Sequence, residues 1–369
     1  MNKKLIKLFK HPGVFFRDYF NKRYPETNSE QKYTVNEEEG VHHAEHKLWE
    51  IESSISLPMI YEIDAVFTWV NARDKKWLSK KNLYLKDAKL GCENSADDAR
   101  FEDHNELYYS VNAVKKYLPW IRNIYIVTDN QKPNWLNEDD EQIIFVDHTD
   151  LISSKFLPTF NSHVIEAHLH KINGLSENFI YFNDDVFVAQ YLDKEHFFRK
   201  NGVSSFFLST KNIEEMIIKG VSTATLKASI NSRNILIQDT GIDPKLTLVH
   251  SYVPLKKSVY EEFWRLHESR ILEFLPNKFR GENDLNLATF LIPWLMYIKG
   301  QSVITNEICY YFNIRSNHAL AQYKKLINMR SNRILAHSFC ANDFSTINQK
   351  NDRDVGKDLI QMLRKYYQD

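Results

Sequence analysis

Glycine is scarce in this sequence, with 10 residues among 369. Neither Gly-x-Gly-x-x-Gly nor Gly-x-x-x-x-Gly-Lys-Ser/Thr occurs, which excludes the glycine-rich loops of dinucleotide-binding folds and of P-loop enzymes. Any phosphate group that the protein handles must therefore be bound by side chains or through a metal ion.

The sequence also has few cysteines, no net charge and no long apolar run. Cys92, Cys309 and Cys340 are odd in number and far apart, which favours a reducing compartment over a disulfide framework or a zinc site. Because 48 Lys and Arg residues balance 48 Asp and Glu residues, no nucleic-acid partner is expected. No apolar run is long enough to span a bilayer, and the amino terminus lacks the features of a signal peptide. These absences predict a cytoplasmic globular protein.

The first 25 residues form a basic, amphipathic arm. They carry seven Lys or Arg residues against one Asp, interleaved with apolar side chains, and Pro12-Gly13 breaks the pattern. Such an arm suits peripheral contact with the anionic inner face of the cell membrane, although docking on its own domain or on a partner explains it equally well. Residues 26–59 are polar and acidic, which is typical of a linker.

The core of the chain has the pattern of an α/β protein. Four short apolar runs have the composition of buried strands: residues 63–70, 124–129, 143–147 and 178–183. Helical spacing is found in six segments: residues 105–117, 163–169, 258–275, 284–298, 319–330 and 354–367. The order strand, helix, strand, strand, helix, strand predicts a Rossmann-like, mostly parallel sheet with flanking helices, followed by a helical C-terminal part.

Two adjacent carboxylates, Asp184 and Asp185, directly follow the last of these strands. In open α/β sheets ligands bind beyond the carboxyl ends of the strands. Paired carboxylates repel each other, and a hard cation such as Mg²⁺ or Mn²⁺, itself bound to substrate phosphates, would resolve the conflict. The alternative is a solvated turn, in which Asp and Asn are common.

A more specific signal comes from four stretches taken together: Ile63–Asp74, Arg100–Val188, His250–Lys257 with Phe279–Asp284, and Phe339–Asp343. In this order they closely resemble the Stealth family of hexose-1-phosphate transferases, which includes bacterial capsular polysaccharide phosphotransferases and the catalytic subunit of the animal GlcNAc-1-phosphotransferase. The resemblance implies a phosphotransferase domain over residues 60–345, followed by a C-terminal helix within residues 346–369.

The sequence departs from the family pattern at three places: His104, Tyr108 and Asn71-Ala72-Arg73. These departures bear on substrate preference and leave the reaction class unchanged. Residues 210–246 lack clear periodicity and match the variable region of the family, so they are expected to form an acceptor-region insert.

The resemblance also implies a glycosyltransferase-A-like form of the α/β fold and a defined reaction. A UDP-sugar, either UDP-hexose or UDP-HexNAc, would donate sugar 1-phosphate to a hydroxyl group of a growing capsular or cell-surface polysaccharide. UMP would be released and a phosphodiester linkage would form. Two other functions stay open: a metal-dependent glycosyltransferase that releases UDP, and a catalytically silent carbohydrate- or nucleotide-binding module.

Family chemistry suggests the metal ligands and the general base. Asp184 and Asp185 are expected to bind Mg²⁺ or Mn²⁺ together with Asn342 and Asp343. His250 is expected to be the base, because the ordinary pKa of histidine lies near neutral pH. The alternatives are that His250 is a core residue and that His163 or His168 is the base.

The phosphate and uridine contacts are assigned in the same way. Arg280 and Arg100 are expected to clamp the phosphates, because guanidinium groups make bidentate phosphate contacts. Asp284 is expected to orient Arg280 or to complete the polar shell of the site. Together, His250, Asp185 and Arg280 are the predicted catalytic residues.

The end of the first strand is expected to receive the uridine. Asp64, Trp69 and Asn71 are the predicted contacts, with Trp69 stacking on the base. Packing of Trp69 in the core is the alternative.

Overall fold

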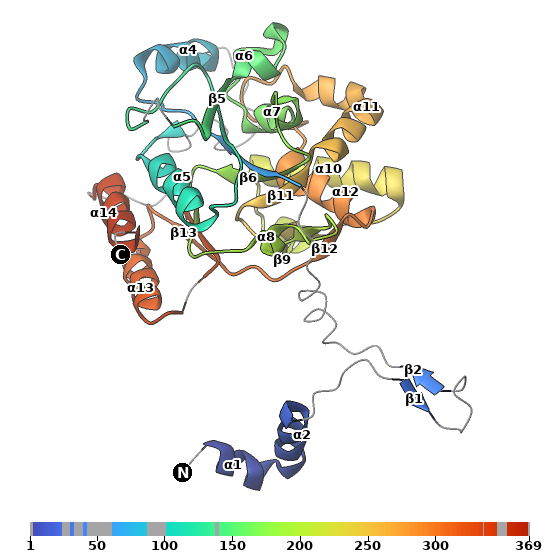
Figure 1. The fold of residues 1–369 in the computed structure, drawn as a ribbon. Coiled ribbons are helices and arrows are strands. Elements are labelled where there is room, and N and C mark those ends of the chain that lie inside the picture. Colours follow the sequence, from blue (N-terminus) through green and yellow to red (C-terminus); the bar gives the residue numbers. More distant parts are fainter. Residues whose placement is uncertain are drawn as a thin grey trace. The chain divides into compact units, whose positions relative to one another are not determined.

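The computed structural model describes residues 3–23, 30–32, 40–42, 61–86, 101–136, 140–334, 336–344 and 353–367. The chain divides into two compact units, residues 1–59 and residues 60–369 (Figure 1). Most of the predicted linker lies outside the described residues, as do Cys92 and Arg100.

The first unit contains the basic arm. Two short helices, α1 (Lys3–Lys10) and α2 (Pro12–Arg23), meet at the predicted break. Proline is favoured in the first turn of a helix, where its missing N–H is not needed. The apolar side chains of Phe9, Phe16 and Phe20 are exposed. In the segment predicted as a linker, β1 (Glu30–Lys32) pairs antiparallel with β2 (Gly40–His42).

The second unit is built on a five-stranded sheet with the strand order β11-β6-β3-β4-β5. The strands are β3 (Ile63–Thr68), β4 (Ile124–Thr128), β5 (Ile143–Asp147), β6 (Asn178–Asn183) and β11 (Val253–Lys256). The first four are parallel, and β11 runs antiparallel to β6 at the edge. β3, β4 and β6 are almost entirely buried, as expected for parallel strands covered on both faces. The predicted mostly parallel α/β sheet is confirmed.

The strand order creates a switch point between β3 and β6. From β3 the chain moves to β4 and then β5, and it returns to the opposite side of β3 to form β6. Thr68 and Asn183 are paired where β3 and β6 end. In doubly wound sheets the connecting segments diverge at such a point and leave a crevice beyond the carboxyl ends of the strands. Asp184 and Asp185 therefore follow β6 at this crevice.

Helices flank the sheet and agree with most of the predicted segments. They are α4 (Lys75–Lys86), α5 (Glu106–Tyr117), α6 (His148–Leu151), α7 (Ser162–Glu166), α8 (Lys194–Phe197), α9 (Ile213–Ile218), α10 (Ala224–Thr240), α11 (Lys257–Phe274), α12 (Ile292–Ile298), α13 (Ala319–Ser331) and α14 (Val355–Tyr367). The predicted helix 163–169 ends earlier, because α7 gives way to a 3-10 turn. The predicted helix 284–298 is divided into a π-helical turn, Leu287–Leu291, and α12, because Pro293 cannot donate the hydrogen bond of a regular helix.

A second, three-stranded sheet brings the end of the chain to the switch point. Its order is β13-β14-β7, from β13 (Cys309–Asn313), β14 (Ser338–Asn342) and β7 (Val186–Val188). β7 begins immediately after Asp185, and the Ala341 N–H donates to the Asp185 carbonyl. α13 and α14 share one apolar cluster with this sheet, and Figure 1 shows them side by side.

Two smaller strand pairs complete the unit. β8 (Ser204–Phe206) pairs parallel with β12 (Ser302–Ile304), and β9 (Leu208–Asn212) pairs antiparallel with β10 (Leu246–Leu248). β9, α9 and α10 give regular structure to much of the segment 210–246, for which the sequence shows no clear period.

Candidate active site at the switch point

The turn between β6 and β7 carries the two adjacent carboxylates. Burial raises the pKa of Asp184 well above its usual range, and the negative charges of Asp185 and Asp103 add to the rise. Burial likewise raises the pKa of Glu106, with Asp184 as the main charge that acts on it. Four carboxyl groups therefore converge at the carboxyl end of β6.

Glu106 reaches this cluster because it lies on the buried face of α5. It is 5% exposed and lies one helical turn before the buried Ser110. Ser110 donates a hydrogen bond to the Val186 carbonyl, so α5 packs on the strand that follows the Asp-Asp turn. Asn105 at the N-cap of α5 has a left-handed backbone conformation and makes no side-chain capping hydrogen bond.

The carboxylate cluster fits a hard divalent cation. Oδ1 of Asp185 is buried and has no hydrogen-bond partner. An orphaned carboxylate oxygen among like charges is costly unless a cation neutralises it, and Mg²⁺ and Mn²⁺ prefer oxygen ligands. Asp184 and Asp185 are therefore suitable ligands, with Asp103 and Glu106 close enough to add to the negative field.

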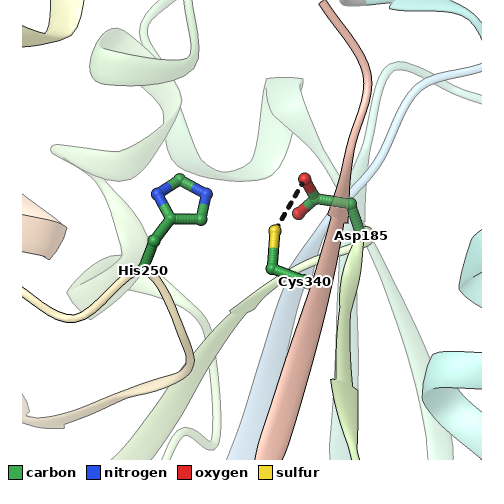
Figure 2. Close-up of side chains that lie close together, drawn as sticks. All are labelled: Asp185, His250 and Cys340. Atoms are coloured by element: carbon green, nitrogen blue, oxygen red, sulfur yellow. Dashed lines mark hydrogen bonds between the residues drawn. The ribbon is translucent and has the colours of Figure 1, made fainter. Parts of the chain in front are cut away.

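His250 lies beside Asp185, as Figure 2 shows. A ring nitrogen of His250, a carboxylate oxygen of Asp185 and Sγ of Cys340 all lie within 4.8 Å of one another. His250 comes from the loop between β10 and β11, whereas Cys340 comes from β14. The Cys340 thiol donates to Oδ2 of Asp185 at 3.3 Å, and burial followed by the charge of Asp185 raises the pKa of that thiol.

The His250 side chain is exposed at one side, but protein atoms crowd its imidazole. This desolvation lowers its pKa, and the cation of Lys211 acts in the same direction, while the charge of Asp185 opposes them. The ring packs against Tyr311 with 5.2 Å between centroids. His250 is thus a neutral imidazole at neutral pH beside a carboxylate, which is the state that a general base requires.

A hydrogen-bond network around the buried carboxylate of Glu307 supports the loop that carries His250. Oε2 of Glu307 lies 2.9 Å from Nε2 of His196 and 3.2 Å from Nδ1 of His337. Burial would raise the pKa of Glu307, but hydrogen bonds from these two histidines outweigh it and lower the pKa to about 2. Ser338 donates to Glu307 and is 2.7 Å from the hydroxyl of Ser251, the residue after His250.

Asp343, a predicted metal ligand, lies apart from the Asp185 group, with Glu102 and His104, and the ligand atoms of these three residues are within 4.8 Å of one another. Arg315 binds both of its carboxylate oxygens, and Nε2 of His104 lies 3.0 Å from Oδ2. Burial opposes these contacts, but together they lower the pKa of Asp343. Its charge is already compensated, so Asp343 fits a role in fixing Arg315 and His104. Asn342 ends β14 two residues after Cys340 and so lies nearer the cluster.

Asp64, a predicted uridine contact, lies away from the crevice. It lies near the start of β3, at the opposite end from the crevice, and is fully buried. Arg122 binds it with two bonds of 2.9 and 2.6 Å, and the backbone N–H groups of Asn123 and Ser176 donate to it as well. Its two carboxylate oxygens accept these four hydrogen bonds, so the structure gives Asp64 a scaffolding role, and its uridine contact stays a prediction.

Trp69 and Asn71 do lie at the crevice end of β3. Trp69 is 4% exposed, and its indole N–H is buried without a partner. Asn71 accepts from the Arg73 N–H, and its backbone forms two hydrogen bonds with the Gln131 side chain. Core packing accounts for the Trp69 ring, while its unpaired N–H leaves one donor for a ligand.

Arg280 and Asp284 are near each other in sequence but have different partners. Arg280 donates to Ser162 and Thr225, at 2.6 and 2.9 Å. Asp284 is fully buried and instead receives hydrogen bonds from His163, Asn161 and Asn277. Asp284 therefore holds its own loop and does not orient Arg280 directly.

The alternative bases are less suitable than His250. His163 is hydrogen-bonded to Asp284, and Nδ1–H of His168 donates to the Val164 carbonyl inside the core. Burial lowers the pKa of His168 to about 4. Both rings are almost completely buried, so neither can reach a substrate hydroxyl without rearrangement.

Arg280 is linked to the crevice through an apolar cluster. Its neighbour Phe279 packs in one group with Trp77, Phe101 and Phe160. Trp77 lies in the first turn of α4, the helix after β3, and the Phe101 carbonyl accepts from the Ala72 N–H. Arg280 is therefore tethered to the loops that follow β3, although no direct contact joins it to Asp185 among the described residues.

Comparison with known proteins identifies the family of the chain. A family model described as Stealth protein CR2, conserved region 2, matches residues 100–206. The chain is 54% identical over 348 residues to a capsular polysaccharide phosphotransferase of Haemophilus influenzae, covering 94% of this chain and 95% of that protein. It is 51% identical to one of Actinobacillus suis (100% and 99% covered) and 49% identical to one of Neisseria meningitidis (99% of each).

Among solved structures, a galactosyltransferase crystallised with donor and acceptor sugar analogues gives a TM-score of 0.39 at 10% identity. The match covers 81% of this chain and 95% of that chain.

Neutralising one carboxylate of the cluster should raise the Tm of the cation-free protein and reduce the further rise in Tm that divalent cations cause. Asp184→Asn removes repulsion worth about 1 kcal/mol, which raises Tm by roughly 2–4 °C. The pKa of Asp184 is raised in the folded state, so its ionisation costs stability as pH rises above the ordinary Asp pKa. The Tm of Asp184→Asn should therefore exceed that of the wild type by more at pH 8 than at pH 5.

Thermal unfolding with and without MnCl₂ measures both effects. Mn²⁺ should raise the Tm of the wild type more than that of Asp184→Asn, whereas Glu261→Gln on the surface of α11 should respond like the wild type. An equal Mn²⁺ response of wild type and Asp184→Asn would show that the cation binds elsewhere.

Proposed function

Because the chain belongs to the Stealth family and is a phosphotransferase, we propose that it transfers sugar 1-phosphate from a UDP-sugar to a hydroxyl group of a growing capsular polysaccharide. The acceptor oxygen attacks the β-phosphorus, the bond between that phosphorus and the bridging oxygen breaks, and UMP leaves. The sugar C1–O bond stays intact, so the product is a phosphodiester. UDP-hexose and UDP-HexNAc are both suitable donors.

The proposal is supported chiefly by the position of His250 beside Asp185 at the switch point. Phosphoryl transfer depends mostly on positioning and on neutralising the charge that develops. A Mg²⁺ or Mn²⁺ ion held by Asp184 and Asp185 would supply that neutralisation to the donor phosphates. The buried and orphaned Oδ1 of Asp185 fits this role.

His250 would accept the proton of the attacking hydroxyl. Its lowered pKa keeps the imidazole neutral, and the nearby carboxylate of Asp185 stabilises the imidazolium that forms. The Glu307 network holds the neighbouring Ser251 and so fixes the loop that carries His250.

Arg280 would bind the donor diphosphate. Its guanidinium donates to two hydroxyl groups, those of Ser162 and Thr225, and no carboxylate in the described part of the chain pairs with it, so its charge is available to an anion. The unpaired indole N–H of Trp69 and the backbone around Asn71 offer polar contacts to the uridine. Arg100 stays a predicted phosphate contact on sequence grounds.

Two other functions make different products. A metal-dependent glycosyltransferase would break the C1–O bond and release UDP, and a silent binding module would release no nucleotide. The names of the relatives favour the phosphotransferase, and so does His250, since a binding module needs no base.

The released nucleotide distinguishes these functions. Incubation with a panel of UDP-sugars, a capsular oligosaccharide acceptor and Mg²⁺ should yield UMP and a phosphodiester signal in the ³¹P NMR spectrum of the product. Stoichiometric UDP without phosphorus in the polymer would contradict the proposal.

Substitution of His250 should remove the acid limb of the pH–rate profile. A base works only when deprotonated, so the wild-type rate should fall as pH drops through a pKa below the ordinary histidine value of about 6.5. His250→Gln cannot take up a proton and should lower kcat by ~10²–10⁴ and abolish that limb. His318→Gln at the exposed start of α13 is the matched control. Near-normal kcat in His250→Gln would assign the base to another group.

The basic arm would hold the enzyme at the cytoplasmic face of the membrane, near its lipid-linked or growing acceptor. The described helices of the arm expose Phe9, Phe16 and Phe20, and no helix in the described part of the chain is long and apolar enough to cross a bilayer. Apolar insertion and basic charge act together at an anionic surface.

Vesicle sedimentation tests the arm. Each base near an anionic surface contributes about 1 kcal/mol, so replacing Lys3, Lys4, Lys7 and Lys10 with Gln should release the protein from phosphatidylglycerol vesicles. Activity on a soluble acceptor should be unchanged. Sedimentation equal to that of the wild type would mean that the arm docks on protein.

A further inference from the structure

A groove outside the active site runs along the exposed side of α5. It has a volume of about 580 Å³ and lies between α5, the loop after β4 and α14. Among the described residues that line it, all but Ala113 are polar, aromatic or basic, and none is Asp or Glu. These described side chains present rings and positive charge, unlike the carboxylates that dominate the switch point.

The rings of the groove are held rigidly. The centroids of Tyr108 and Trp135 are 5.4 Å apart and those of Tyr108 and Tyr109 are 5.0 Å apart, both in edge-to-face contact. Tyr108 is 37% exposed, so the ring is open to a ligand. Fixed aromatic rings offer apolar faces at low entropic cost, and the C–H face of a sugar ring packs well on such a surface.

The charges of the groove match a phosphodiester chain. Lys116 and Arg364 line it from α5 and α14, and Nε of Arg364 donates to the Tyr109 hydroxyl at 3.3 Å. Asn105 and Asn112 add amide donors and acceptors for sugar hydroxyls. A polymer of sugars joined through phosphodiesters carries one negative charge per linkage, apolar sugar faces and many hydroxyl groups. It can therefore bind the basic groups, the aromatic rings and the amides of the groove.

The groove also begins next to the reaction site. Asn105 precedes Glu106 of the carboxylate cluster, and its N–H donates to Asp103 at 2.9 Å. From Asn105 to Lys116 the groove follows eleven helical steps of 1.5 Å, a length of roughly 17 Å and more than one sugar unit. A chain whose end reacts at Asp185 can therefore continue along α5.

We propose that the groove between α5 and α14 binds the sugar-phosphate chain of the acceptor behind its reacting end. This inference rests on the proposed function, because only a phosphotransferase of this kind makes such a chain. The groove gives long acceptors extra binding energy that short acceptors lack, and it keeps the product near the site for the next addition.

The acceptor-length dependence of KM tests the groove. The enzyme's own product, separated by size, supplies short and long acceptors. In the wild type KM should fall at least tenfold from the shortest to the longest acceptor. Trp135→Ala and Arg364→Gln should each remove most of that fall, with kcat and KM for the shortest acceptor unchanged. Arg270→Gln on α11 lies outside the groove and is the matched control.

A binding measurement separates the groove from catalysis. The inactive Asp185→Asn protein should retain the long chain in affinity electrophoresis, and adding Arg364→Gln should weaken that retention about tenfold. UDP binding, followed by calorimetry, should be the same in Trp135→Ala and the wild type. Loss of UDP binding in Trp135→Ala would assign the groove to the donor and overturn the proposal.

The remaining outcomes are distinguishable. UMP release without any dependence of KM on chain length, or full length dependence in both variants, would overturn the groove and leave the proposed function intact. Release of UDP with the length dependence preserved would overturn the proposed function, and the groove would then bind a chain without phosphate.

Discussion

The repulsion among buried carboxylates at the end of β6 is the constraint on which the rest of this structure depends. Asp184, Asp185, Asp103 and Glu106 come from two segments about 80 residues apart and converge where water is scarce. Such a cluster destabilises the fold unless protons or a cation neutralise it. The surrounding architecture holds these groups together: β7 continues directly from the Asp-Asp turn, α5 packs on β7, and β14 pairs with it.

Three other buried carboxylates in the domain have a different role, because each is already compensated. Asp64 is held by Arg122, Asp284 by His163 and two amides, and Glu307 by two histidines and hydroxyl groups. These groups fix strands and loops in place. Asp185 differs from these three groups, because its Oδ1 is buried without a hydrogen-bond partner among the described residues.

Local patterns were sufficient to predict the parallel sheet, since β3, β4 and β6 are apolar, rich in β-branched and aromatic residues, and end in polar residues. They were not sufficient for the β13-β14-β7 sheet, whose pairing joins residues about 150 positions apart. The sequence reasoning grouped Asp64 with Trp69 and Asn71, whereas a residue at the start of a parallel strand lies at the edge opposite the crevice. The contact of Asp343 with His104 could not be predicted, because the two residues are 239 positions apart. By contrast, the burial of Glu106 could have been predicted, because Glu106 shares the helical face of Ser110 and Val114.

The most direct test of the central claim is to locate a divalent cation bound to this protein. Crystals grown with MnCl₂ and UDP should give an anomalous difference peak within coordination distance of the Asp184 and Asp185 carboxylates. The same peak should touch the diphosphate of the nucleotide. A peak found only at another site, such as the His196–Glu307–His337 group, with none beside Asp185, would contradict the account.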